Sequence, residues 1–167
     1  MPEEYEGPDR PEGLETPPSF FSSEFGERSG ADFGPLVEIT VEGVFQSATD
    51  PNADPFVLLS DGARQLPIMI GFPEAQAISL PMENKEARRP MTHDLFRAAL
   101  DALDVEVDRV VIDDFYGGVY YAKLVLRQGD VEVSLDARPS DSIALALRFD
   151  APIFVADGIF DAAMEDR

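Results

Sequence analysis

The stretch "SLDARPSDSIALALRFDAPIFVAD", residues 134–157, predicts a strand, a helix and a second strand in direct succession. Apolar and polar residues alternate at its start, as they do in a half-buried strand. Pro139 suits the first position of a helix, and the run that follows is so apolar that we expect this helix to be buried. Three charged residues, Asp136, Arg138 and Asp141, nevertheless crowd the junction between strand and helix.

The alternation in "VEVSLDAR" predicts that Asp136 and Arg138 project from the polar face of the strand. Asp141 falls in the first turn of the helix, near the positive end of the helix dipole. We therefore expect the three groups to meet at one strand-to-helix corner. Two interpretations stay open. Either Arg138 bridges the two aspartates and locks the corner, or the aspartates hold a divalent cation or position a water while Arg138 or the helix start holds a phosphate.

The segments before this stretch predict a sheet built mainly from hairpins. Pro67 places one arm of the first hairpin at an edge or bulge, and Thr92 is expected to cap an amphipathic helix. Strands joined by hairpins, with helices inserted between them, favour an α+β fold: a mostly antiparallel, twisted sheet in a single domain. The expected strands cover residues 35–45, 55–60, 64–70, 105–115, 119–127, 130–137 and 152–156, and the expected helices cover 74–80, 93–104, 139–149 and a turn or two at the end.

The charge of the chain is its strongest compositional signal. There are 33 acidic and 13 basic residues, which give a formal net charge of -20, unlike the usual nucleic-acid-binding protein. Lys85 and Lys123 are the only lysines. An acidic, lysine-poor surface is typical of proteins from a salt-rich cytoplasm, because salt screens the self-repulsion. The absence of cysteine excludes disulfides, thiolate zinc sites and cysteine nucleophiles.

The composition divides the chain at residue 34. Residues 1–34 are acidic and rich in Pro and Gly, without a sustained apolar period, so we expect a disordered tail. Residues 35–167 are expected to form the domain. Apolar runs stay well short of the roughly 20 residues of a membrane span, and the start lacks the features of a signal peptide. We therefore expect a cytoplasmic protein that does not enter a membrane.

Other polar residues are candidates for a site. His93, the only histidine, precedes Asp94 at a helix start, where a lone histidine is more often a surface or capping residue than a catalyst. Glu74 lies in the first turn of its helix, where the dipole favours an acid in any case. Tyr121 and Lys123 share the polar side of a strand, which suits either stacking and phosphate contact with a nucleic-acid strand or an ordinary exposed sheet face.

Four stretches, taken in order, resemble the bifunctional nuclease domain family: "LPIMIGFPEAQAI", "RPMTHDLF", "VVIDDFYGGVYYAKLVL" and especially "LDARPSDSIALALRFDAPIFVA". The resemblance covers residues 36–160. It implies an α+β domain, usually a homo-oligomer, with cleavage of both DNA and RNA by some members. The recurring polar positions of the family match here as Glu74, Arg89, His93, Asp94, Asp136, Arg138, Ser140 and Asp141.

The resemblance leads to the hypothesis of a metal-assisted nuclease that acts on DNA and RNA with little sequence preference. In this hypothesis Asp136 and Asp141 bind Mg²⁺ or Mn²⁺, His93 is the general acid or base, and Arg138 steadies the phosphate. Glu74 would act beside them, and Asp94 would be an additional ligand. The remaining predicted substrate-binding residues are Arg89, Lys123, Tyr121 and Ser140. The alternative is a non-catalytic interaction or regulatory module in which the polar corner is purely structural.

Overall fold

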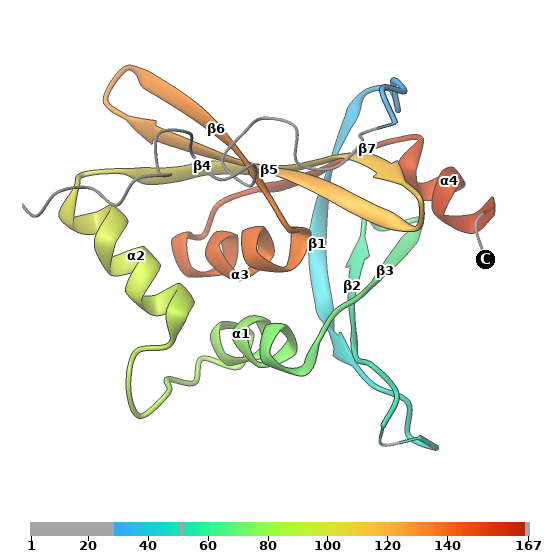
Figure 1. The fold of residues 1–167 in the computed structure, drawn as a ribbon, viewed down its shortest axis with the longest axis horizontal. Helices are drawn as coiled ribbons and strands as arrows, with labels where there is room; N and C mark the ends of the chain where they lie inside the picture. The colour runs from blue at the N-terminus through green and yellow to red at the C-terminus, as the bar shows by residue number, and fades with distance from the viewer. Residues whose placement is uncertain (1–28, 51, 166–167) are drawn as a thin grey trace, which may run out of the picture.

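The structure, a computed structural model, describes residues 29–50 and 52–165 and shows a seven-stranded sheet with four helices (Figure 1). The strands lie in the order β3-β2-β1-β7-β4-β5-β6. The strands are β1 (Leu36–Phe45), β2 (Phe56–Ser60), β3 (Gln65–Met69), β4 (Glu106–Tyr116), β5 (Val119–Gln128), β6 (Val131–Ala137) and β7 (Ile153–Ala156). The helices are α1 (Phe72–Met82), α2 (Thr92–Ala102), α3 (Pro139–Phe149) and α4 (Ile159–Glu165).

The sheet is mixed but mostly antiparallel. β4 and β7 form its one parallel pair among the described residues, and the other five neighbouring pairs are antiparallel. Pro67 lies in β3, at one edge of the sheet, where its missing N–H leaves no gap in a central ladder. The predicted α+β class, the first hairpin and the edge position of Pro67 are confirmed.

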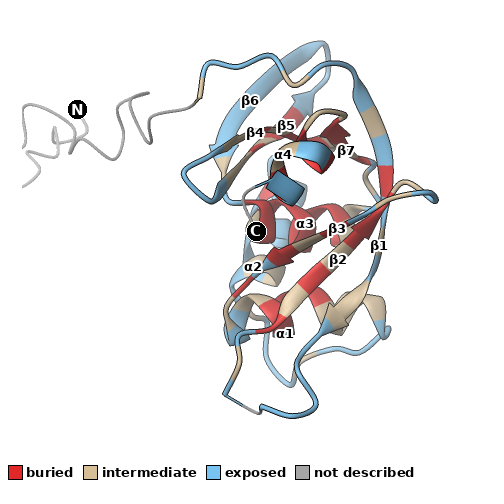
Figure 2. Ribbon diagram, turned by 90° about the vertical axis from the view of Figure 1, so that its right-hand side faces the viewer, coloured by how far each residue is buried: buried red, intermediate tan, exposed pale blue. Residues whose placement is uncertain are grey.

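Helix α3 is the central element of the core, as its apolar sequence predicts. It packs against α1, α2, β4 and β5, and in Figure 2 it is coloured almost entirely as buried. Ile143 and Ala144 are fully buried, and Pro139 is the first helical residue, as predicted. The junction before α3 is therefore held between the sheet and the other helices.

Two elements leave apolar side chains uncovered. In β6, the second edge strand, Val133 and Leu135 are paired with Leu126 and Leu124 of β5, yet they remain exposed while their partners are buried. The apolar stripe of α2 consists of Leu95, Phe96, Ala99 and Leu100 and continues to Leu103, the C-cap residue, and only Leu100 of it is buried. Its other large side chains, Leu95, Phe96 and Leu103, are exposed. Figure 2 shows most of β6 as exposed.

The described chain is attached to the domain from Ser29 onward. The backbone N–H of Ser29 donates to Oδ2 of the buried Asp114 at 2.9 Å, and its hydroxyl donates to the same carboxylate. Gly158 N donates to Phe33 O at 2.7 Å. Residues 1–28 of the predicted tail lie outside the described residues. No helix in the described ranges is long and apolar enough to cross a membrane.

Candidate functional site

Arg138 lies at the end of β6 and connects two acidic residues. The strand ends at Ala137, so the predicted alternation stops one residue earlier and Arg138, the N-cap of α3, turns toward α1. Its Nε lies 2.7 Å from Asp141 Oδ2, and its Nη1 lies 3.0 Å from Glu74 Oε1. Arg138 thus links the first turn of α1 to the first turn of α3.

His93 joins this group from α2. Its Nε2 lies 3.0 Å from Asp141 Oδ1, and its side chain is only 16% exposed. His93 is the second residue of the helix, because Met91, and not the predicted Thr92, is the N-cap of α2. Three helix N-termini, those of α1, α2 and α3, therefore converge on Arg138 and Asp141. We refer to the connected group of Glu74, His93, Arg138 and Asp141 as the corner.

The ion pairs fix the protonation pattern of the corner. Burial raises the pKa of Asp141, but hydrogen bonds from Arg138 and His93 outweigh burial and hold that pKa below its usual value. The ionised carboxylate only accepts hydrogen bonds, so the Nε2 of His93 donates to it. In the neutral imidazole the lone pair then belongs to Nδ1, which is the nitrogen that can accept a proton.

A groove of about 720 Å³ opens beside the corner. Its polar side chains include Glu74, Arg138 and Ser140, and its apolar lining comes mainly from β3 and the β4–β5 turn. Asp141 and His93 do not line it, and their connection to the groove runs through the guanidinium of Arg138. The groove therefore meets the charged corner at Arg138 and Glu74.

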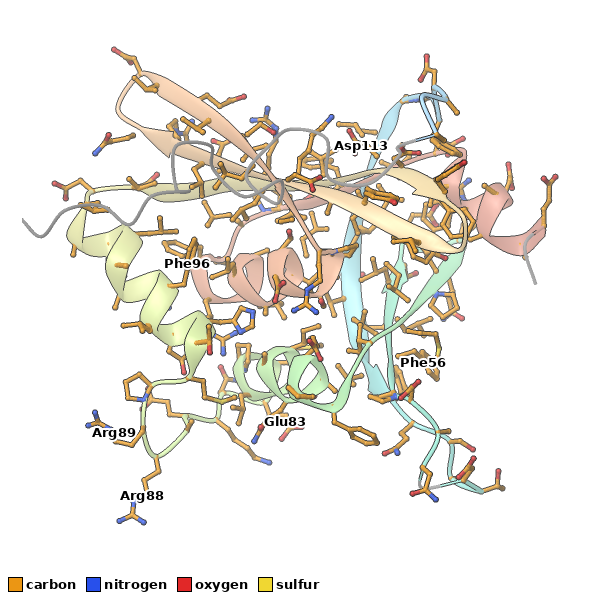
Figure 3. The ribbon with its side chains drawn as sticks, in the orientation of Figure 1. Phe56, Glu83, Arg88, Arg89, Phe96 and Asp113 are labelled. Atoms are coloured by element: carbon orange, nitrogen blue, oxygen red, sulfur yellow. The ribbon has the colours of Figure 1, made fainter. Side chains whose placement is uncertain are left out.

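Four other predicted site residues lie on β5, on β6 and in the loop between α1 and α2. Asp136 is exposed and lies opposite Lys123 in the β5–β6 register, and Lys123 forms an ion pair with Asp113. Tyr121 is half-buried and lies on β5, as Lys123 does. Arg89 is exposed in the loop between α1 and α2 (Figure 3).

Asp94, a predicted metal ligand, is bound to Arg148. Nε of Arg148 donates to Asp94 Oδ1 at 2.7 Å, and Met91 N donates to Asp94 Oδ2 at 2.9 Å. The hydrogen bond from Arg148 lowers the pKa of Asp94. The structure does not gather the predicted set of Asp94, Asp136 and Asp141, and the part of the chain that it describes holds no group of three metal-binding side chains.

Sequence reasoning missed Arg148. Its side chain is 5% exposed, and its Nη1 donates to Ala77 O at 2.7 Å and to Ala144 O at 2.8 Å. Ala77 O is the carbonyl that Pro81, four residues later in α1, cannot serve because it has no N–H. Two features of the sequence could have indicated this contact: an arginine inside the apolar run of α3, and a proline inside a helical pattern.

Carboxylates outnumber guanidinium groups at the corner. It holds two carboxylates, Glu74 and Asp141, against one guanidinium, that of Arg138. A phosphate that approaches this corner gains little net attraction from it. Binding of a phosphodiester there needs additional positive charge, from a bound cation or from the surrounding surface.

Comparison with known proteins gives two findings. The family model described as "Bifunctional nuclease domain" matches residues 57–166. Two proteins of Mycobacterium tuberculosis, the uncharacterized proteins MT1877 of strain CDC 1551 and Rv1829 of strain H37Rv, are each 40% identical to this chain over 128 residues. That alignment covers 75% of this chain and 75% of each relative. The matched region contains all the residues of the corner.

Proposed function

Because the chain belongs to the bifunctional nuclease domain family, we propose that it is a nuclease that hydrolyses phosphodiester bonds of DNA and RNA with little sequence preference. One observation carries the proposal: His93, Asp141, Arg138 and Glu74 come from three places in the chain and form one connected group at the edge of a groove. A proton acceptor beside an arginine is the combination that phosphodiester hydrolysis needs.

The roles within the group follow from its hydrogen bonds. Asp141 holds the imidazole of His93 through Nε2, so that Nδ1 serves as the general base or, once protonated, as the general acid. Arg138 reaches both the corner and the groove and steadies the phosphate. Ser140, which is buried and also lines the groove, is proposed as a further substrate contact.

A divalent cation, Mg²⁺ or Mn²⁺, is part of the proposal. Mg²⁺ commonly takes one or two carboxylates and completes its shell with water and substrate phosphate, so it needs no preformed cage of three protein ligands. Glu74 and Asp141, which share Arg138, are the residues that would hold it, in place of the set predicted from the sequence. Such a cation supplies the positive charge that the corner lacks and activates water.

The test is cleavage of single-stranded DNA and RNA oligonucleotides by the purified protein, with Mg²⁺, with Mn²⁺ and with EDTA. We expect cleavage of both substrates with metal and none with EDTA. Asp141→Asn should lower the rate about 100-fold, whereas Asp161→Asn, an equal change of charge at an exposed position of α4, should leave it unchanged. Metal binding is read independently as a rise in melting temperature that Asp141→Asn removes.

A second candidate is a non-catalytic interaction or regulatory module of the same fold. It is favoured by the pairing at the corner, where Glu74, Arg138, Asp141 and His93 already bind one another, and by the position of His93 away from the groove lining. Binding of oligonucleotides without cleavage under any metal condition would support this candidate and contradict the nuclease.

Self-association and location complete the proposal. A homo-oligomer is supported by the exposed apolar side chains of the edge strand β6, Val131, Val133 and Leu135, because exposed apolar edges are commonly covered by another chain. Light scattering should give a mass above the 18.3 kDa of one chain; a mass of one chain would contradict this part.

We propose a cytoplasmic location, where DNA and RNA are available as substrates.

A further inference from the structure

In the part of the chain that the structure describes, most basic residues are neutralised by direct contact with an acid. Within residues 29–50 and 52–165, the lysines and arginines that form ion pairs are Arg64, Lys85, Arg97, Arg109, Lys123, Arg127, Arg138 and Arg148. In the same ranges only Arg88 and Arg89 form none. These two arginines are neighbours in the loop between α1 and α2. Their charges are therefore the ones most available to a ligand.

The loop presents both side chains to solvent from an anchored backbone. Arg88 and Arg89 are exposed, and Figure 3 shows both pointing away from the body of the molecule. At the start of the loop Lys85 N donates to Leu80 O at 2.9 Å, and at its end Met91 N donates to Asp94 Oδ2, also at 2.9 Å. Anchors at both ends lower the ordering entropy that a ligand has to overcome.

A hollow of about 760 Å³ lies under this loop. Its lining includes three basic side chains, each of which is paired with an acid: Lys85 with Glu83, Arg97 with Asp101 and Arg148 with Asp94. The positive charge that remains at this surface therefore comes from Arg88 and Arg89, whereas acids exceed bases by far in the whole chain. The loop and the hollow form a locally cationic surface on a strongly anionic protein.

The proposed substrate needs such a surface. A protein with a formal charge of -20 repels a polyanion, and the corner itself holds more carboxylates than cations. Neighbouring phosphates of a strand remain unneutralised even if one cation binds at the corner. Arginines without acidic partners are the groups that offset this repulsion, because each can bind one phosphate through its planar fork of donors.

We propose that Arg88 and Arg89 form a second phosphate-binding site, which holds the nucleic-acid strand a few nucleotides from the bond that is cleaved at the corner. This inference rests on the proposed nuclease function. Arg89 stands four positions before His93, which limits the distance between their Cα atoms to about 14 Å. The two sites therefore lie within a few nucleotides of each other along a bound strand.

The experiment measures binding without cleavage. Binding of a fluorescein-labelled 12-nucleotide single strand is followed by fluorescence anisotropy in EDTA, over a series of KCl concentrations, for Arg88→Gln, Arg89→Gln and the double variant. Each phosphate contact on a single strand contributes about 0.7 to the slope of log K against log salt. We expect each single variant to lose about 0.7 of slope and, at 0.1 M KCl, about fivefold in affinity.

Arg109→Gln is the matched control. It removes the same charge from an arginine that is paired with Asp108 and Glu132, so it should leave the slope unchanged. Equal losses in the control and in the loop variants would overturn the proposal, because they would report net charge alone. Displacement of the oligonucleotide by polyglutamate at equal charge concentration would also overturn it, since the loop would then serve acidic peptides in general.

A small diester separates this proposal from the proposed function. Bis(p-nitrophenyl) phosphate is too short to contact both sites, so its hydrolysis should be the same in wild type and in Arg88→Gln/Arg89→Gln, while oligonucleotide cleavage falls. Loss of binding in the loop variants of a protein that cleaves nothing would support the phosphate site and contradict the nuclease. Cleavage and binding that are both unchanged in the loop variants would leave the nuclease standing and overturn the phosphate site.

Discussion

Arg138 forms ion pairs with Glu74 and Asp141 while 65% of its side chain stays exposed. Exposed ion pairs contribute little to stability, so Arg138→Ala should lower the free energy of unfolding by under about 1 kcal/mol. The same change should greatly slow oligonucleotide cleavage, because it removes the proposed phosphate contact. Thermal melting and cleavage rates of one preparation check both parts; a large loss of stability would instead assign Arg138 to a structural lock.

Asp94 gives a pH dependence whose sign follows from its pKa. The hydrogen bond from Arg148 holds that pKa below its usual value, so the folded state favours the ionised form more than the unfolded state does. The resulting stabilisation is complete above about pH 5 and is lost as the pH falls through the folded-state pKa. Urea unfolding should therefore show that the stability difference between wild type and Asp94→Asn shrinks from pH 5 to pH 3. A constant difference would contradict the ion pair.

For individual residues, the sequence predicted which charged groups belong to the corner better than it predicted which of them are in contact. Arg138, Asp141 and their order at a helix start could be recognised because they are close in sequence. The contact between His93 and Asp141 joins residues 48 positions apart, and the one between Glu74 and Arg138 depends on the packing of α1. Asp136 was placed with Arg138 on the assumption that the strand alternation continued past Ala137, where β6 ends.

Among the elements, α1 contains a proline that depends on α3. Pro81 leaves Ala77 O without its helical donor, and Arg148 supplies one. Arg148→Met should destabilise the protein by about 3 kcal/mol, because it leaves a half-buried carboxylate and a carbonyl without their donor. Pro81→Ala restores an N–H, so it should stabilise the Arg148→Met protein by about 1 kcal/mol more than it stabilises the wild type.

Chemical denaturation of the wild type, the two single variants and the double variant measures this coupling. Additive effects would show that Arg148 does not replace the donor that Pro81 lacks.

Element identity was largely predictable, since hydrophobic periodicity and proline positions located the hairpins and the buried helix α3. The exposure of β6 and of most of the α2 stripe was not, because periodicity shows which face is apolar but not whether another element covers it.

The whole molecule is dominated by its negative charge. Screening of self-repulsion stabilises a compact acidic protein, so the melting temperature should rise between about 0.1 M and 1 M KCl. Because salt also weakens phosphate contacts, the advantage of wild type over the Arg88→Gln/Arg89→Gln variant in oligonucleotide binding should shrink over the same range. Differential scanning fluorimetry checks the first part; a flat or falling melting temperature would contradict adaptation to a salt-rich cytoplasm.

The arrangement of the whole sheet lay beyond local reasoning. β7 lies between β1 and β4 and is parallel to β4, although the three strands are far apart in sequence. Composition and hairpin signals fix the class and the antiparallel pairs of consecutive strands, whereas the two pairs that β7 makes, antiparallel with β1 and parallel with β4, are fixed only when α3 has packed on the sheet. The same packing brings the starts of α1, α2 and α3 together and so creates the corner.

The most direct test of the central claim is a kinetic cycle on His93 and Asp141. Cleavage of a single-stranded oligonucleotide with Mg²⁺ is measured for wild type, His93→Gln, Asp141→Asn and the double variant. If the two residues act as one unit, each single variant loses about 100-fold in kcat and the double variant loses no more than the weaker single variant. Losses that multiply, or variants that cleave as fast as wild type, would contradict an active site at this corner.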